Sequence, residues 1–101
     1  MAAALIVGAG DATGGAIAKA FAREGYTACV NRRARNADQL EALAQSIRAE
    51  GYAARAYAAD ARIEEEVVAM VDAIERDVGP IEVAVFNIGA NVNFSILDMT
   101  A

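Results

Sequence analysis

Short apolar runs alternate with amphipathic segments along the whole chain, and this alternation limits the folds that the chain can adopt. Three of the runs are continuously apolar, as expected for buried strands, and the third along the chain is a weaker, Ala-rich run that is assigned as much by its place in the alternation. The four runs cover residues 3–7, 27–30, 53–59 and 81–86. Because the segments between them repeat apolar residues at helical spacing, the pattern predicts right-handed crossovers and a parallel sheet covered by helices on both faces.

Residues that typically begin and end helices delimit the three predicted helices. Gly25 follows the first helix, Gly51 the second and Gly79-Pro80 the third, as expected for caps and breakers. Asn36 with Gln39 resembles a capping box that opens the second helix. The third helix is expected to bury one apolar face, made of Ile63, Val67, Met70, Val71, Ile74 and Val78.

The predicted fold is α/β, a Rossmann-type three-layer sandwich whose parallel sheet has the strand order 3-2-1-4. The fourth strand then lies beside the first, where the strand order reverses. A ligand is expected in the crevice over the carboxyl ends of the strands. A chain of 101 residues has room for one core, so we expect a single domain over residues 1–101.

Composition and charge argue against several classes of function. The formal net charge is −5, whereas nucleic-acid-binding proteins gather Lys and Arg to neutralise phosphates. No apolar run reaches the ~18 residues that span a bilayer, and the N-terminus carries no basic signal-peptide region, so we expect a cytoplasmic protein without membrane contact. The absence of histidine makes a metal site improbable and excludes a Ser-His-Asp or Cys-His pair. We expect the single cysteine, Cys29, to be an unreactive core residue.

A glycine-rich turn over residues 8–15 comes directly after the first strand and opens the first helix. Glycine allows positive φ and close approach of the backbone, and the N–H groups at a helix start attract a pyrophosphate. A purely structural tight turn is the alternative, but the position within a strand–helix–strand unit favours dinucleotide binding. The residues expected to contact the dinucleotide here are Gly8, Gly10, Asp11, Ala12, Thr13 and Gly14.

The end of the second strand indicates which dinucleotide binds. NAD-binding folds place Asp or Glu about 20 residues beyond the glycines, whereas the 2′-phosphate of NADP(H) needs a cation. This chain has Asn31, Arg32 and Arg33 there, and an arginine fork can bind a phosphate through two hydrogen bonds. NADP(H) is therefore favoured over NAD(H), with Arg32 and Arg33 as cofactor-binding residues. The alternative is that they form, with Arg35, a solvated loop.

The chain resembles the short-chain dehydrogenase/reductase family over its whole length. The glycine-rich turn, Arg32-Arg33, Ala59-Asp60-Ala61 and Asn87-Ile88-Gly89-Ala90 come in the order that this family shows. The chain departs from the family pattern in the turn, where Ala12 replaces the middle glycine. It departs again after the fourth strand, where Asn-Ile-Gly-Ala replaces Asn-Asn-Ala-Gly. The resemblance indicates a divergent member of the family.

The resemblance implies roles for residues beyond the second strand. It implies that Asp60, with Ala61, contacts the adenine ring, and that Asn87, Ile88 and Gly89 line the cofactor near the adenine ribose. Asp60 as a cap of the third helix and Asn87 as a turn residue are the alternatives.

The catalytic pair of the family is missing from these residues. Family members use a Tyr whose pKa is lowered by a Lys four residues later, helped by a Ser. The three tyrosines here have no such Lys, because Lys19 is the only lysine and Gly15 stands four residues before it. We therefore assign no catalytic residue.

The resemblance implies an NADP(H)-binding portion of an oxidoreductase that transfers hydride between nicotinamide and a carbonyl or alcohol substrate. The catalytic half is absent from the chain, so we expect the 101 residues alone to be inactive, and the complete enzyme to be a homo-oligomer. A stand-alone nucleotide-binding or regulatory module is the alternative. Another Rossmann-like binder, such as a methyltransferase, is disfavoured because Arg32 and Arg33 stand where an acidic residue would hold the ribose.

Overall fold

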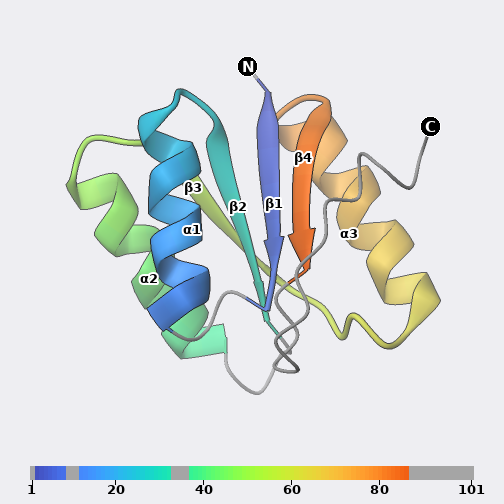
Figure 1. Ribbon diagram of the computed structural model, residues 1–101. Coiled ribbons are helices and arrows are strands. Elements are labelled where there is room, and N and C mark those ends of the chain that lie inside the picture. The colour runs from blue at the N-terminus through green and yellow to red at the C-terminus, as the bar shows by residue number, and fades with distance from the viewer. Residues whose placement is uncertain (1, 9–11, 33–36, 87–101) are drawn as a thin grey trace.

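The computed structural model describes residues 2–8, 12–32 and 37–86 of the chain (Figure 1). Strands and helices alternate throughout these residues, and every predicted strand and helix is present. The elements are β1 (Ala3–Val7), α1 (Ala12–Arg23), β2 (Thr27–Arg32), α2 (Ala37–Ala49), β3 (Ala54–Ala58), α3 (Glu64–Asp77) and β4 (Ile81–Phe86). None of the helices in these residues is long and apolar enough to cross a bilayer.

The four strands form one parallel sheet in the order β3-β2-β1-β4. β1 pairs with β2 without interruption, from Ala3 opposite Thr27 to Val7 opposite Asn31. On its other side β1 pairs with β4, and β2 pairs with β3. The predicted fold is thus confirmed, and the carboxyl ends of all four strands meet at one edge of the sheet, which lies at the bottom of Figure 1.

The two faces of the sheet have different covers. Helices α1 and α2 pack on one face, here called the α1/α2 face, and α3 packs on the other, the α3 face (Figure 1). The buried residues of the α1/α2 face are Ala4, Ile6, Ala18, Ala22, Ala28, Val30, Leu40, Ala44, Ile47 and Ala54. Those of the α3 face are Ala3, Leu5, Val7, Cys29, Ala59, Met70, Ile74 and Ala84.

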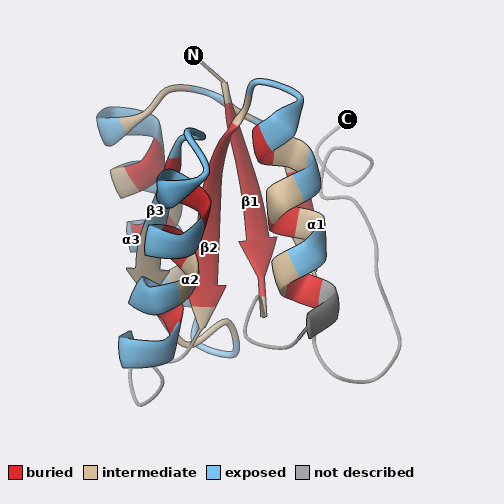
Figure 2. Cartoon of the chain, turned by 90° about the vertical axis from the view of Figure 1, so that its left-hand side faces the viewer, coloured by how far each residue is buried: buried red, intermediate tan, exposed pale blue. Residues whose placement is uncertain are grey.

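Burial differs between the central strands and those at the sheet edges. All of β1 and all but the last residue of β2 are buried, and both strands are red in Figure 2. In β3 only Ala54 is buried, and in β4 only Ala84. The expectation of buried strands therefore holds for β1 and β2 but not for β4, and β3 and β4 each have a strand neighbour on one side only among the described residues.

The apolar face of α3 is shorter than predicted. Met70 and Ile74 are buried, but Ile63 is 41% exposed. Ile63 occupies the N-cap with an extended backbone (φ −109°, ψ 112°), so it lies before the helical repeat begins. Since Ile63 and not Asp60 is the N-cap, and no side chain makes a capping hydrogen bond, the alternative role of Asp60 as a cap of this helix is wrong.

Candidate functional site

Backbone hydrogen bonds join the loops that follow β1, β2 and β3 at the carboxyl edge. The Gly8 N–H donates to the Asn31 carbonyl oxygen (3.0 Å), and the Ala59 N–H donates to the Arg32 carbonyl oxygen (2.9 Å). These two bonds continue the strand pairing just beyond β1 and β3. The predicted phosphate-binding turn, the basic cluster and the Asp60 loop therefore leave the sheet from neighbouring points.

Gly8 begins the glycine-rich turn in a conformation that suits glycine. Its φ is 80°, in the left-handed region where a side chain would be strained. Helix α1 starts at Ala12 and Thr13, so its N-terminus lies at the carboxyl edge of the sheet, as expected for a phosphate site. Gly10 and Asp11 lie outside the described residues.

The last glycines of the turn lie inside α1, where packing accounts for them. Gly14 is buried, and a Cβ added to Gly15 would lie 3.4 Å from Cδ1 of Leu43 in α2. A Cβ at Gly15 would therefore be in van der Waals contact with this neighbour. The turn thus combines a start that suits phosphate binding with an end that lets α1 and α2 approach.

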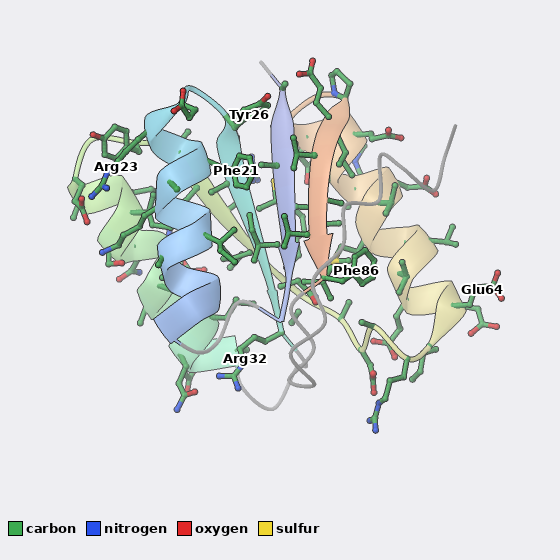
Figure 3. All side chains as sticks on the ribbon, in the orientation of Figure 1. Phe21, Arg23, Tyr26, Arg32, Glu64 and Phe86 are labelled. Atoms are coloured by element: carbon green, nitrogen blue, oxygen red, sulfur yellow. The ribbon has the colours of Figure 1, made fainter. Side chains whose placement is uncertain are left out.

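Arg32 ends β2 at the carboxyl edge, near the bottom of Figure 3. The side chain is half-buried, and its Nη1 donates a hydrogen bond to Oε1 of Gln39 in α2 (2.8 Å). Because this partner is neutral, and no carboxylate among the described residues forms a salt bridge with Arg32, the positive charge can serve an anionic ligand. Arg33, Arg35 and Asn36 lie outside the described residues.

Asp60 follows β3, and its carboxylate binds a neighbouring arginine. Oδ1 accepts from the backbone N–H (2.9 Å) and the Nε (3.0 Å) of Arg62, and Oδ2 accepts from Nη2 (2.9 Å). The Asp60 N–H donates to Oε1 of Glu66 (2.8 Å), and Ala61 is half-buried against the α3 face. An adenine ring at Asp60 would have to share this carboxylate with Arg62. The residues predicted after β4, namely Asn87, Ile88 and Gly89, lie outside the described residues.

Asn31 is the functional candidate whose contacts the sequence did not reveal. Its side chain is buried, with 1% of the residue exposed, and Nδ2 donates to the carbonyl oxygens of Tyr57 (2.9 Å) and Ala59 (3.2 Å). A longer contact reaches the Arg32 carbonyl oxygen (3.5 Å). An amide at the end of an otherwise apolar strand is the available signal, since a buried polar side chain needs partners.

Burial keeps two acidic side chains of the described residues, Tyr57 and Cys29, in their protonated form. Burial raises the pKa of the Tyr57 hydroxyl, the opposite of what a tyrosine acid–base catalyst needs. Burial also raises the pKa of the Cys29 thiol to about 12, so the thiol is protonated at neutral pH. Among these residues no group of three His, Cys, Asp or Glu side chains could hold a metal ion.

Comparison with known sequences gives a family match over nearly the whole chain. The sequence profile of the family described as short chain dehydrogenase matches residues 2–101. Gluconate 5-dehydrogenase of Gluconobacter oxydans is 38% identical over 86 residues, which are 85% of this chain and 33% of that protein. The 2,3-dihydro-2,3-dihydroxybenzoate dehydrogenase of Bacillus subtilis is 36% identical over 83 residues, 81% of this chain and 31% of its own length. The chain thus spans about a third of the length of these curated relatives.

Solved structures show the same arrangement of strands and helices. A short-chain dehydrogenase from Rhodopseudomonas palustris superimposes with a TM-score of 0.80 at 45% identity, over 97% of this chain and 45% of that one. A variant of actinorhodin polyketide ketoreductase, crystallised with NADPH, superimposes with a TM-score of 0.76 at 29% identity. That match covers 85% of this chain and 33% of the ketoreductase.

Proposed function

Because the chain belongs to the short-chain dehydrogenase family, we propose that it is the NADP(H)-binding part of an oxidoreductase that transfers hydride between nicotinamide and a carbonyl or alcohol substrate. The observation that carries this proposal is the convergence of three loop starts, at Gly8, Arg32 and Asp60, on one edge of a parallel sheet. That edge is where Rossmann-type folds bind dinucleotides.

Each described part of this edge suits one part of the cofactor. Gly8, with its positive φ, and the N-terminus of α1 would hold the pyrophosphate. Arg32, which has a neutral partner in Gln39, would bind the 2′-phosphate. The Asp60 loop would border the adenine ring, with its carboxylate shared with Arg62. The bound cofactor would donate or accept the hydride, and these residues would hold its pyrophosphate and adenosine parts.

Because the chain lacks the catalytic Tyr and Lys pair, we propose that residues outside these 101 carry out the proton transfer. No tyrosine in the chain has a lysine four positions later, and burial raises the pKa of Tyr57. The proposal therefore assigns cofactor binding to this chain. It assigns proton transfer, substrate binding and the contacts of a homo-oligomer to the rest of the protein.

The substitution Arg32→Asp tests the cofactor preference. An aspartate would remove the charge-assisted bonds to the 2′-phosphate and repel it, so NADPH binding should weaken on the order of 100-fold, and NADH binding much less. Dissociation constants for both cofactors, measured by calorimetry on the natural gene product, check this. Arg55→Asp in β3 makes the same charge change at an exposed strand residue, and both affinities should stay within about twofold. Equal losses for NADPH and NADH in Arg32→Asp would contradict the proposal.

The second candidate is a nucleotide-binding module without catalysis, which the absent catalytic pair favours. The intact mass of the natural gene product under denaturing conditions separates the two. A mass well above 10.5 kDa leaves room for a catalytic half, and such a product should reduce or oxidise a carbonyl–alcohol pair with NADP(H). A mass near 10.5 kDa would favour the module, which binds NADPH without turnover.

A further inference from the structure

We propose that Asn31 is a positioning residue that fixes the adenosine end of the cofactor site, because its side chain ties the loop after β3 to the end of β2. The inference rests on the proposed function and adds a residue that would not touch the cofactor. Its basis is the set of hydrogen bonds that converge on Asn31 at the carboxyl edge.

Asn31 lies near the end of β2 and bonds to both neighbouring strands, through its backbone next to β1 and through its side chain at β3. Its own carbonyl oxygen accepts from the Gly8 N–H (3.0 Å), which follows β1. Its side-chain Nδ2 donates to the carbonyl oxygens of Tyr57 (2.9 Å) and Ala59 (3.2 Å), at the end of β3. With 1% of the residue exposed, water cannot replace these bonds, and the amide is held in one place.

The bonds matter most at β3, which has only β2 as a strand neighbour among the described residues. Ala59, the residue after β3, is held at both backbone groups. Its N–H donates to the Arg32 carbonyl oxygen (2.9 Å), and its carbonyl oxygen accepts from Asn31 (3.2 Å). The Asp60 loop therefore leaves the sheet at a fixed distance from Arg32. Without the Asn31 amide, one of the two attachments would be lost, and the groups that face adenine and the 2′-phosphate would no longer be held in register.

The substitution Asn31→Leu keeps the size of the side chain and removes both donors without adding charge. Asn31→Ser is a milder variant that leaves one hydroxyl donor, and it serves if Asn31→Leu does not fold. The matched control is Cys29→Ser. Cys29 lies two residues earlier in β2, on the same face of the strand, and is fully buried. A hydroxyl there should lower stability without reaching the carboxyl edge.

The experiment measures the affinity of the full natural chain for NADPH and for adenosine 2′,5′-bisphosphate, below the melting temperature of each variant. The bisphosphate probes the adenosine end alone. We expect Asn31→Leu to weaken both ligands by about tenfold or more, since small displacements of positioning groups have effects of this size, and Asn31→Ser to weaken both by less. Cys29→Ser should lower the melting temperature and keep both affinities.

Wild-type affinities in both Asn31 variants would overturn the inference, as would losses no larger than those of Cys29→Ser. Those results leave the proposed function intact, because the wild-type protein would still bind NADPH. Failure of the wild-type protein to bind either ligand would overturn the proposed function itself, and the positioning role of Asn31 with it.

Discussion

The α1/α2 face and the α3 face belong to the same sheet but bury different kinds of side chain. Among the described residues, the buried cluster of the α1/α2 face consists only of Ala, Val, Leu and Ile. The two buried polar residues, Thr27 and Asn31, alternate along β2 with the same parity as Cys29, which packs on the α3 face. The buried hydroxyl of Tyr57 lies on this face as well. Within residues 2–8, 12–32 and 37–86, the buried polar side chains therefore lie on the α3 face.

The cover over each face explains the difference. Two helices pack on the α1/α2 face, where Ala18 and Ala22 let α1 lie close to the strands and Gly15 comes close to Leu43. A polar group there would have few partners. On the α3 face one helix packs on the sheet, and Asn31 finds its partners in backbone carbonyls at the end of β3. The α1/α2 face therefore stabilises the fold through apolar packing, and the α3 face contains the hydrogen bonds of Asn31 at the carboxyl edge.

Labelling of the Cys29 thiol should show the largest effect of burial on the α3 face. Burial raises its pKa to about 12, so at pH 8 the thiolate should be about a thousandfold scarcer in the folded chain than in the unfolded one. We expect iodoacetamide to label Cys29 only after guanidinium unfolding, as measured by mass spectrometry. Fast labelling of the native chain would show that α3 opens readily and that the α3 face does not keep Cys29 buried.

The same raised pKa sets the direction of a pH effect on stability. The unfolded thiol ionises at lower pH than the folded one. The contribution of the buried neutral thiol is therefore complete below about pH 9 and is lost as pH rises toward 12. Cys29→Ala should lack this component of the alkaline decline, while the declines due to other groups remain.

Truncation of one isoleucine on each face compares their packing. Ile47 in α2 and Ile74 in α3 are both fully buried. Ile→Ala at either site should lower the free energy of unfolding by about 2 to 5 kcal/mol, the cost of lost burial plus a cavity. We expect Ile47→Ala to lose about 1 kcal/mol more, because the face under two helices can relax less around the cavity. Urea denaturation of both variants measures this, and equal losses would mean that the faces pack equally well.

Most of the fold could be predicted from the sequence because its signals are local. Apolar runs, helical spacing and terminal glycines each lie within a few residues. Right-handed crossovers then limit the topologies, and the usual order of a Rossmann half indicates the strand order. β2 runs to Arg32 instead of ending at Val30, because pairing with β3 continues through two polar residues to the contact of Arg32 with Ala58. The apolar pattern in the sequence ends at the first polar residue, whereas β2 ends where its pairing with β3 ends.

Less of the candidate site could be predicted, because its bonds connect residues far apart in the chain. The places of Gly8, Arg32 and Asp60 at the carboxyl edge followed from their order after the strands, and the structure agrees. The partners of Asn31 lie 26 and 28 residues away, and no local pattern identifies them. The pairing of Asp60 with Arg62 is local, but a sequence leaves open which of several neighbouring charges takes part.

The hydroxyl of Tyr57, on the α3 face, is expected to change the free energy of unfolding only slightly. Its hydroxyl oxygen is buried and has no hydrogen-bond partner among the described residues, and an unpaired buried hydroxyl is costly. Tyr57→Phe should therefore raise the free energy of unfolding by about 1 kcal/mol, as measured by urea denaturation.

Tyr52→Phe is the matched control. Because Tyr52 is 37% exposed, this substitution should leave the free energy of unfolding unchanged. A loss of stability in Tyr57→Phe would mean that the hydroxyl donates a hydrogen bond to a partner. The first partner to test is the carboxylate of Asp77, which also raises the Tyr57 pKa, and the variant for this test is Asp77→Asn. In the part of the chain that the structure describes, each buried polar side chain of the α3 face would then have a hydrogen-bond partner, whereas the buried cluster of the α1/α2 face is apolar.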